Sequence, residues 1–277
     1  MSARELNDLS RMCIHTITLK PWDIDRAAQK FSEVGAGGIT VWRDALAGRN
    51  IRQTGNMLRQ KNLEIVSLCR GGFFPAANAE GRANAVKENI RAIEEAAELG
   101  APLLVLVCGA VAGQALSVSR QRITEGIEAC VAAAEKNGVV LAIEPLHPMY
   151  AGDRSAINTL RQANDVAEYF NSKWVGVAVD VYHLWWDPEL KEQIGRCAEH
   201  DNLSAFHICD WKVPTTDMLN DRGIMGEGCI NVREIRGWVE EAGFNGFNEV
   251  EIFSTQHWQE DQDKYLNRIV NAYLTKS

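Results

Sequence analysis

The stretch Leu141-Ala142-Ile143-Glu144-Pro145 has the pattern of an apolar strand that ends in a carboxylate. Side chains alternate between the two faces of a strand, so Glu144 shares a face with Ala142 and not with Ile143. Because Pro145 has no backbone N–H to donate, the strand is expected to end at Glu144. A carboxylate buried at that point needs a compensating charge nearby.

Strand-like runs alternate with helix-like segments along the whole chain. The expected strands are Met12 to Leu19, Gly38 to Trp42, Glu64 to Leu68, Pro102 to Val107, Val139 to Glu144, Val175 to Asp180, Leu203 to Ile208 and Gly246 to Ile252. The best-marked helices are Ile24 to Val34, Ala83 to Leu99, Arg122 to Lys136 and Ile157 to Phe170. This alternation indicates parallel strands joined by crossover helices. Eight such units in 277 residues are typical of a closed (β/α)8 TIM barrel, an α/β fold.

The structural alternative is a doubly wound open sheet. Its nucleotide-binding form prefers a glycine-rich first turn, and residues 16–21 contain no glycine. No linker composition divides the chain, so one domain over residues 1–277 is expected. Within it, Asp23 is the expected N-cap of the first helix, which the glycines from Gly35 onward should end.

Composition excludes several classes of protein. A net charge of -8 argues against a nucleic-acid partner, because binding to phosphates normally relies on a basic surface. No apolar run is long enough to span a membrane, and the polar first residues do not resemble a secretory signal. The seven scattered cysteines contain no CxxC pair, which favours buried reduced thiols. A cytosolic protein is expected.

Four consecutive strands are each expected to end in an ionisable residue, namely Glu144, Asp180, His207 and Glu251. Their neighbours along the strands are large and apolar, as expected for residues that pack outward against helices. Alanines stand two positions earlier on three of these strands, at Ala142, Ala178 and Ala205. Since chemistry gathers at the C-terminal strand ends of a TIM barrel, we expect the four polar groups to converge on the barrel axis.

Three carboxylates in a barrel mouth would repel one another and be driven to protonate unless a cation lay among them. Three oxygen ligands and one imidazole suit Mn²⁺, Mg²⁺, Co²⁺ or Zn²⁺, and the oxygen-rich set favours the harder ions. An ordinary salt bridge is the alternative for any one residue, but four at matched strand ends favour a metal site. Glu249 shares a face with Glu251 one layer deeper, where it either supports the ligands or marks an error of register.

At this point the chain resembles the xylose isomerase-like TIM-barrel family, in its sugar phosphate isomerase/epimerase branch. The resemblance covers essentially the whole chain and rests on the order and spacing of residues 143–145, 180–183, 206–210, 226–228 and 243–252. It implies that Glu144, Asp180, His207 and Glu251 hold one divalent ion, commonly Mn²⁺. It also implies that the two glutamates move protons and that His183 contacts the substrate.

The expected activity is a metal-dependent sugar isomerase or epimerase acting on a ketose or related polyol by proton transfer through a metal-stabilised enediolate. A dehydratase or other lyase acting on a keto-sugar or inosose is the closest alternative, and a non-catalytic binding barrel is another. The related DNA-repair endonucleases carry extra histidines at the ends of strands three and four. This chain has Cys69-Arg70 and Cys108-Gly109 there, which together with its negative charge argues against DNA cleavage. A homo-oligomer is compatible with the sequence.

Further substrate contacts are expected from residues on the strand-to-helix loops. Trp42 and His147 can stack on a sugar, and Arg70, Lys212 or Arg222 can bind a carboxylate or phosphate. For each of them, packing within a loop or at a subunit interface is the alternative. His15 lies inside the expected first strand, and a hydrogen-bonded core histidine is the favoured interpretation.

Overall fold

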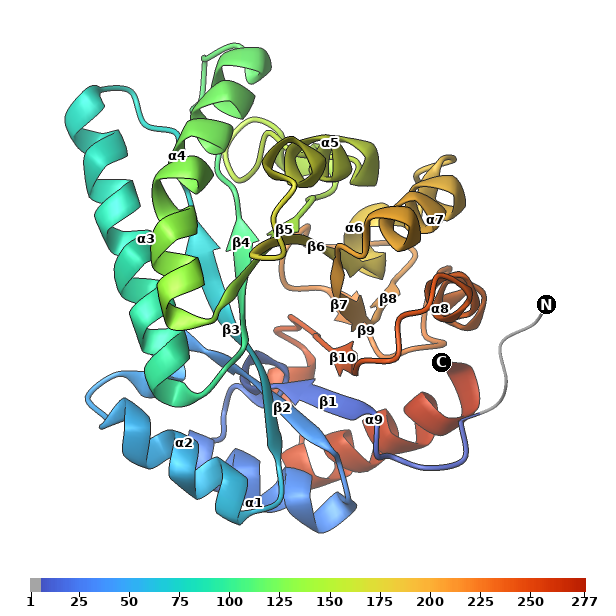
Figure 1. Ribbon diagram of the computed structural model, residues 1–277. Helices are drawn as coiled ribbons and strands as arrows, with labels where there is room; N and C mark the ends of the chain where they lie inside the picture. The colour runs from blue at the N-terminus through green and yellow to red at the C-terminus, as the bar shows by residue number, and fades with distance from the viewer. Residues whose placement is uncertain (1–5) are drawn as a thin grey trace.

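A computed structural model describes residues 6–277 of the chain. Within that range the main strands are parallel and close into a barrel in the order β1-β10-β7-β6-β5-β4-β3-β2 (Figure 1). The eight strands are β1 (Met12–His15), β2 (Gly38–Trp42), β3 (Glu64–Gly72), β4 (Leu103–Val107), β5 (Val140–Glu144), β6 (Val175–Asp180), β7 (Leu203–Ile208) and β10 (Asn248–Val250). The predicted (β/α)8 barrel is therefore confirmed.

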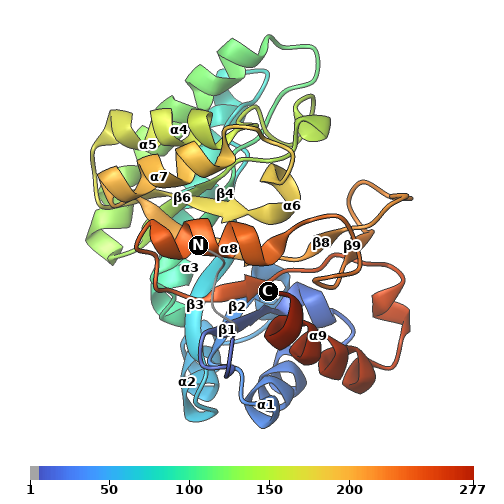
Figure 2. The same ribbon diagram turned by 90° about the vertical axis from the view of Figure 1, so that its right-hand side faces the viewer.

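Helices surround the strands on the outside of the barrel (Figures 1 and 2). They are α1 (Ile24–Val34), α2 (Ile51–Gln60), α3 (Ala79–Leu99), α4 (Leu116–Asn137), α5 (Leu160–Phe170), α6 (Val181–Leu184), α7 (Leu190–His200), α8 (Val232–Glu241) and α9 (Gln262–Lys276). Short 3-10 turns are η1 (Thr16–Leu19), η2 (Arg43–Leu46), η3 (Pro148–Tyr150) and η4 (His257–Gln259). The last helix lies beside the first, where Lys30 Nζ is 2.7 Å from Asp263 Oδ1.

The apolar side chains form an outer layer and a small inner core. Ile143, Val179 and Phe206 point outward into the large core between strands and helices. The inner core fills the barrel axis with Cys69, Leu103, Val105, Ala142, Ala178 and Ala205. The alternation predicted along these strands is thus confirmed, and small side chains lie beneath the polar strand ends.

The boundaries of α1 agree with the prediction because its capping residues are distinctive. The Asp23 side chain accepts a hydrogen bond of 2.8 Å from the backbone N–H of Arg26. Gly35 ends the helix in the left-handed conformation at φ 85°, where glycine avoids the strain of a Cβ.

The first strand is shorter than predicted, since it ends at His15 and residues 16–19 form η1. At this point two threonine hydroxyls, in place of backbone groups, form hydrogen bonds to the neighbouring strands. Thr16 Oγ1 accepts from the Trp42 N–H at 2.9 Å, and Thr18 Oγ1 donates to the Val250 carbonyl at 3.0 Å. His15 is therefore the last residue of β1 and lies at the barrel mouth.

Other element boundaries also differ from the prediction. β10 is limited to Asn248–Val250, so Glu251 follows the strand directly, and β3 extends to Gly72. The third helix begins earlier, at Ala79, because the Asn78 side chain caps it by accepting from the Gly81 N–H at 2.7 Å. The fourth also begins earlier, at Leu116, and the fifth later, at Leu160 after the cap Thr159.

The segment that follows β7 folds back over the barrel mouth. It contains the antiparallel pair β8 (Asp210–Trp211) and β9 (Arg222–Gly223). The buried Asp210 carboxylate accepts hydrogen bonds from four backbone N–H groups at 2.8 to 2.9 Å, those of Trp211, Gly226, Gly228 and Ile230. This carboxylate anchors residues 226–230, which follow β9, to the start of β8.

All seven cysteines are unpaired, and all except Cys229 are buried, as predicted. Among residues 6–277, none of the helices combines the length and the apolar character that crossing a bilayer requires.

Candidate metal centre

The four predicted ligand residues lie together at the C-terminal end of the barrel. Glu144, Asp180, His207 and Glu251 each offer one ligand atom, and these atoms all lie within 4.8 Å of one another. Every one of the four side chains is buried. Three of these residues come from β5, β6 and β7, and the fourth directly follows β10. Four neighbouring strands of the barrel therefore bring the set together.

The donor atoms of Glu144 and His207 fit a cation. Glu144 Oε1 and His207 Nδ1 are 2.9 Å apart, and neither atom has a hydrogen-bond partner other than this contact among the described residues. Buried polar atoms are rarely left unsatisfied, because each costs about 1–3 kcal/mol of desolvation. A cation held between them would satisfy both.

Arg222 contributes to the charge balance of the cluster. Its Nη1 lies 2.9 Å from both Asp180 Oδ2 and Glu251 Oε2. The guanidinium is buried and also lies over the rings of Tyr182 and Phe253, at 4.4 and 5.1 Å. The carboxylates of Glu144, Asp180, Glu251 and the adjacent Glu249 outnumber the cations of Arg222 and His15 by two, which leaves a formal charge of -2. That residual charge matches one divalent ion.

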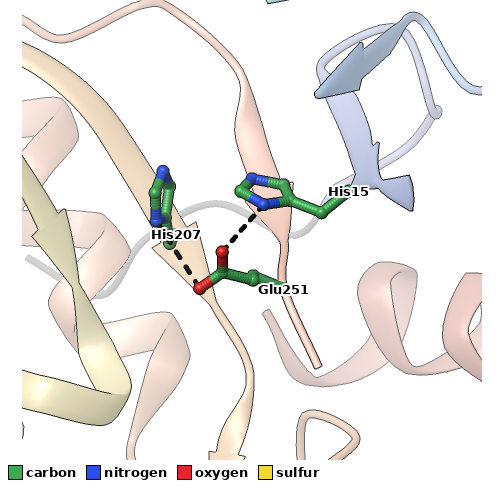
Figure 3. A group of neighbouring side chains, drawn as sticks. All are labelled: His15, His207 and Glu251. Atoms are coloured by element: carbon green, nitrogen blue, oxygen red, sulfur yellow. Dashed lines mark ion pairs between the residues drawn. The ribbon is translucent and has the colours of Figure 1, made fainter. Parts of the chain in front are cut away.

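His15 is the buried, hydrogen-bonded histidine that was predicted, and it also contacts a candidate ligand. Its Nδ1 is 2.9 Å from Glu251 Oε1, and its Nε2 is 3.1 Å from Glu249 Oε2. Figure 3 shows the Glu251 carboxylate between the rings of His15 and His207. Although burial opposes it, the carboxylates of Glu251 and Glu249 raise the pKa of His15 to about 9.

Glu249 forms a buried polar layer beneath the candidate ligands. Its Oε2 accepts hydrogen bonds from Thr40 Oγ1 at 2.6 Å and Ser67 Oγ at 3.2 Å, while Oε1 lies 3.8 Å from His207 Nε2. Burial raises the pKa of this carboxyl, but His207 and His15 outweigh that effect and hold it below its ordinary value. Glu249 is thus an anion on the side of His207 that faces away from Glu144.

The crowding of acids perturbs the ligand residues themselves. Burial, together with the carboxylates of Glu251 and Glu144, raises the pKa of Asp180 to about 7 against the opposing effect of Arg222. Burial lowers the pKa of His207, but the carboxylates of Glu249 and Glu144 raise it to about 10. A divalent ion among these groups would reverse both tendencies, because it favours carboxylate anions and a neutral imidazole.

A cavity of about 230 Å³ opens beside the cluster. Its lining contains Trp42, Arg70, Val107, Glu144, Leu146, Tyr150, Arg154, His183, Leu219, Arg222, Glu251 and Phe253. Both predicted proton-transfer glutamates therefore face one space. So do four of the predicted substrate contacts, Trp42, Arg70, His183 and Arg222.

The remaining two predicted contacts are not in that lining. His147 packs its half-buried ring near Trp211 and Trp186, with centroid distances of 5.0 and 5.6 Å. The ammonium of Lys212 lies 2.5 Å from Asp221 Oδ1 and donates to Gln256 Oε1 at 3.1 Å. Both residues lie on the surrounding loops.

His183 presents a polar atom at the cavity. Burial and then the nearby Arg222 cation lower the pKa of His183 well below its ordinary value, so the ring is neutral. Arg222 Nη2 lies 3.2 Å from His183 Nε2 and can donate only to an unprotonated nitrogen. The proton then lies on Nδ1, which has no hydrogen-bond partner in residues 6–277.

Sequence reasoning missed several residues of the site. Arg154 and Tyr150 follow β5, and Leu219 belongs to the loop between β8 and β9. Their only signal is a position after a strand end, which they share with many residues that do not reach the cavity. His15 gave a stronger signal, because an imidazole at the end of a strand matches the pattern of His207.

Comparisons with known proteins show the family and the fold. The sequence profile of the family described as xylose isomerase-like TIM barrel matches residues 28–269. Protein SMc04130 from Sinorhizobium meliloti 1021, whose crystal structure is known, is 44% identical and superimposes with a TM-score of 0.93, covering 97% of this chain and 99% of that chain.

Two more distant structures share the fold. The 3-keto-D-glucoside 4-epimerase YcjR from E. coli is 18% identical with a TM-score of 0.77, over 95% of this chain and 98% of that chain. The IolI protein, solved with a zinc atom bound, is 18% identical with a TM-score of 0.82, over 95% and 96%. No match was found among curated protein sequences.

Proposed function

The chain belongs to the xylose isomerase-like TIM-barrel family, and from this membership we propose that it is a divalent-metal-dependent sugar isomerase or epimerase acting on a ketose or a related polyol. The observation that carries the proposal is the cluster of Glu144, Asp180, His207 and Glu251 beside a cavity that two of its glutamates line. Two proteins of the same fold are in keeping with it, since YcjR is an epimerase and IolI binds zinc.

In this proposal Glu144, Asp180, His207 and Glu251 hold one divalent ion. Mn²⁺ is the first candidate, and Mg²⁺, Co²⁺ and Zn²⁺ are alternatives. When bound, such an ion polarises a carbonyl group and stabilises the negative charge that develops on its oxygen.

Glu144 is the residue we assign as the first proton acceptor. Its side chain lines the cavity, so its carboxylate can reach a substrate C–H bond. Removing the proton next to the carbonyl moves the electron pair of the C–H bond into an enediolate. A general base in this role contributes about 10²- to 10⁴-fold to the rate.

Glu251 is assigned the complementary proton transfer. His15 Nδ1 holds its Oε1 at 2.9 Å and Arg222 Nη1 holds its Oε2 at 2.9 Å, so both oxygens have fixed positions. Returning a proton to the opposite face of the same carbon gives an epimer, and returning it to the adjacent carbon gives an isomer. If the proton reaches a leaving hydroxyl instead, the reaction is a dehydration.

The other cavity residues bind and enclose the substrate. The Nδ1–H of His183 is the assigned donor to a substrate oxygen, which would be its first hydrogen-bond partner among the described residues. The side chains of Leu146, Tyr150 and Phe253 exclude water from the proton-transfer step. A cytosolic location and a homo-oligomeric state stay predictions.

Proton exchange in D2O tests the function. Protein loaded with Mn²⁺ is incubated with a panel of ketoses and inososes, and deuterium at the carbon next to the carbonyl is followed by NMR. We expect exchange with at least one compound, lowered by about 100-fold or more in Glu144→Gln. A product lighter by one water would identify the dehydratase alternative.

The control is Glu189→Gln, which neutralises an exposed carboxylate that pairs with Arg161 on the surface. It should exchange protons as the original protein does. Titration calorimetry with Mn²⁺ accompanies each variant, because Glu144→Gln should also weaken metal binding. Normal exchange in Glu144→Gln, or its absence for every compound together with no Mn²⁺ binding, would contradict the proposal.

A further inference from the structure

Two arginines line the candidate cavity without an anionic partner. Arg70 lies in β3 and Arg154 follows η3, and both are partly buried. In the described part of the chain, no carboxylate forms an ion pair with either guanidinium, and neither donates a hydrogen bond. Three other cations near this cavity, Arg222, Lys212 and Arg43, each form ion pairs with carboxylates.

The engaged cations provide the contrast. Arg222 pairs with Asp180 and Glu251, and Lys212 pairs with Asp221. Arg43, which lines a neighbouring cavity together with Arg70, pairs with Glu88 and Glu95 at 2.9 and 2.7 Å. Within residues 6–277, carboxylates thus pair with the neighbouring cations and with neither Arg70 nor Arg154.

The two guanidiniums oppose each other electrostatically. Burial first, and then the charge of Arg154, lower the pKa of Arg70 from its ordinary value. Two partly desolvated cations beside one cavity are costly unless an anion neutralises them. An anionic ligand group in that cavity removes this cost.

Aromatic rings hold both guanidiniums in place. Arg70 lies over the ring of Phe73 at 4.3 Å, and Arg154 lies over the ring of Tyr150 at 5.6 Å. A guanidinium that stacks by its face keeps its N–H edges available, and those edges match the two oxygens of a carboxylate or phosphate. The arrangement is therefore preorganised for an oxyanion.

We propose that Arg70 and Arg154 bind an anionic group of the substrate, a carboxylate or a phosphate, on the part of the molecule that does not meet the two glutamates. This inference rests on the proposed function for the ketose part of the ligand. It narrows the substrate class from neutral sugars to acidic ketoses, that is, keto-sugar acids or ketose phosphates.

The test compares matched substrates on one enzyme. Mn²⁺-loaded protein is assayed for proton exchange with D-fructose, D-fructuronate and D-fructose 6-phosphate, and with D-ribulose and D-ribulose 5-phosphate. We expect kcat/KM to be higher for the anionic member of a pair by about 10- to 100-fold, the range of a charge-assisted hydrogen bond. The comparison of fructuronate with fructose 6-phosphate decides between carboxylate and phosphate.

For each pair of substrates, the preference is the kcat/KM of the anionic ketose divided by that of the neutral ketose. The variants Arg70→Gln and Arg154→Gln should each lower this ratio by about tenfold or more. A folding defect cancels from the ratio, because both substrates are measured on the same preparation. Arg161→Gln is the matched control, since it removes an equal charge from an exposed arginine that pairs with Glu189. A preference for neutral ketoses, or an unchanged ratio in both variants, would overturn the inference.

A separate measurement distinguishes failure of the inference from failure of the proposed function. If no ketose exchanges protons, titration calorimetry with inorganic phosphate and with acetate tests the arginine pair directly. Binding by the original protein that is lost in Arg70→Gln and Arg154→Gln would support the anion site while the isomerase proposal fails. No binding of either anion would overturn the anion site as well.

Discussion

Glu249 is a buried anion that faces the imidazole of His207 from the side opposite Glu144. A carboxylate behind a metal-binding histidine fixes the ring orientation and strengthens the ligand, and losing it typically costs about 10- to 100-fold in metal affinity. Glu249 is therefore assigned as a positioning residue that acts through His207 and His15.

The variant Glu249→Gln should weaken Mn²⁺ binding by about 10- to 100-fold, as measured by titration calorimetry. Thr40→Val is the graded comparison, because it removes the 2.6 Å hydrogen bond to Glu249 Oε2 but keeps the charge of Glu249, and it should have a smaller effect. Unchanged affinity in Glu249→Gln would show that the charge behind His207 has no role in holding the ion.

Single residues of the site differed in how far the sequence could predict them. The convergence of Glu144, Asp180, His207 and Glu251 followed from strand parity, since polar groups at equal positions on adjacent parallel strands must meet. The contact of His15 with Glu251 was not predicted, because the first strand was extended past His15 into threonines whose hydroxyls bond to neighbouring strands. Arg154 could not be predicted, because its position depends on the path of the loop after β5.

Among the elements, the segment that runs from β8 to Ile230 is held by the carboxylate of Asp210. Asp210→Asn places an amide where four backbone N–H groups converge. Because hydrogen bonds to a charged acceptor are worth about 1.5–3 kcal/mol each, we expect a loss of roughly 3 kcal/mol in the free energy of unfolding. Urea denaturation measures it.

Asp217→Asn is the control for that substitution within the same segment. The Asp217 carboxylate accepts from the N–H groups of Leu219 and Asn220 at 2.8 Å, but it is exposed. It should change the unfolding free energy by less than about 1 kcal/mol. Equal losses in the two variants would contradict the anchoring role of Asp210.

Helix packing gives a prediction of opposite sign at two glycines. A Cβ on Gly55 in α2 would lie 2.1 Å from the Leu99 carbonyl oxygen at the end of α3, whereas one on Gly195 in α7 would meet nothing within 4 Å. Gly55→Ala should therefore destabilise the protein by about 1–3 kcal/mol. Gly195→Ala should stabilise it by about 0.5–1 kcal/mol, because alanine favours helix.

Thermal unfolding of the two variants checks this pair. A lower melting temperature for Gly55→Ala and a higher one for Gly195→Ala are expected. Stabilisation by Gly55→Ala would mean that α2 and α3 separate more readily than their contact implies.

At this scale the sequence predicted which elements exist better than where they begin. The caps Asp23 and Gly35 made both ends of α1 predictable. The start of α4 has no side-chain cap on Ala115, and the predicted start lies six residues after the observed one. Such starts depend on how the preceding loop packs, which local propensity does not encode.

For the whole molecule, a bound ion would connect four strands of the barrel. Binding to the folded state alone stabilises a protein by about 2.7 kcal/mol at a ligand concentration 100 times Kd, which corresponds to roughly 5–10 °C in Tm for a chain of this size class. We expect Mn²⁺ to raise Tm accordingly, and a chelator to reverse the rise. The shift should be strongly reduced in Glu144→Gln and preserved in Glu189→Gln. An unchanged Tm after addition of Mn²⁺ would contradict the metal centre.

The barrel closes where β1 pairs with β10, so the first and last strands lie side by side. During synthesis on the ribosome, β1 must wait for nearly the entire chain before its second neighbour emerges. Until then the nascent protein has two unpaired strand edges, which are prone to aggregation and can be bound by chaperones. His15 from β1 and Glu251 after β10 also meet only at this seam. A partly translated chain therefore has an incomplete centre, and the last step of barrel closure is also the step that creates its chemistry.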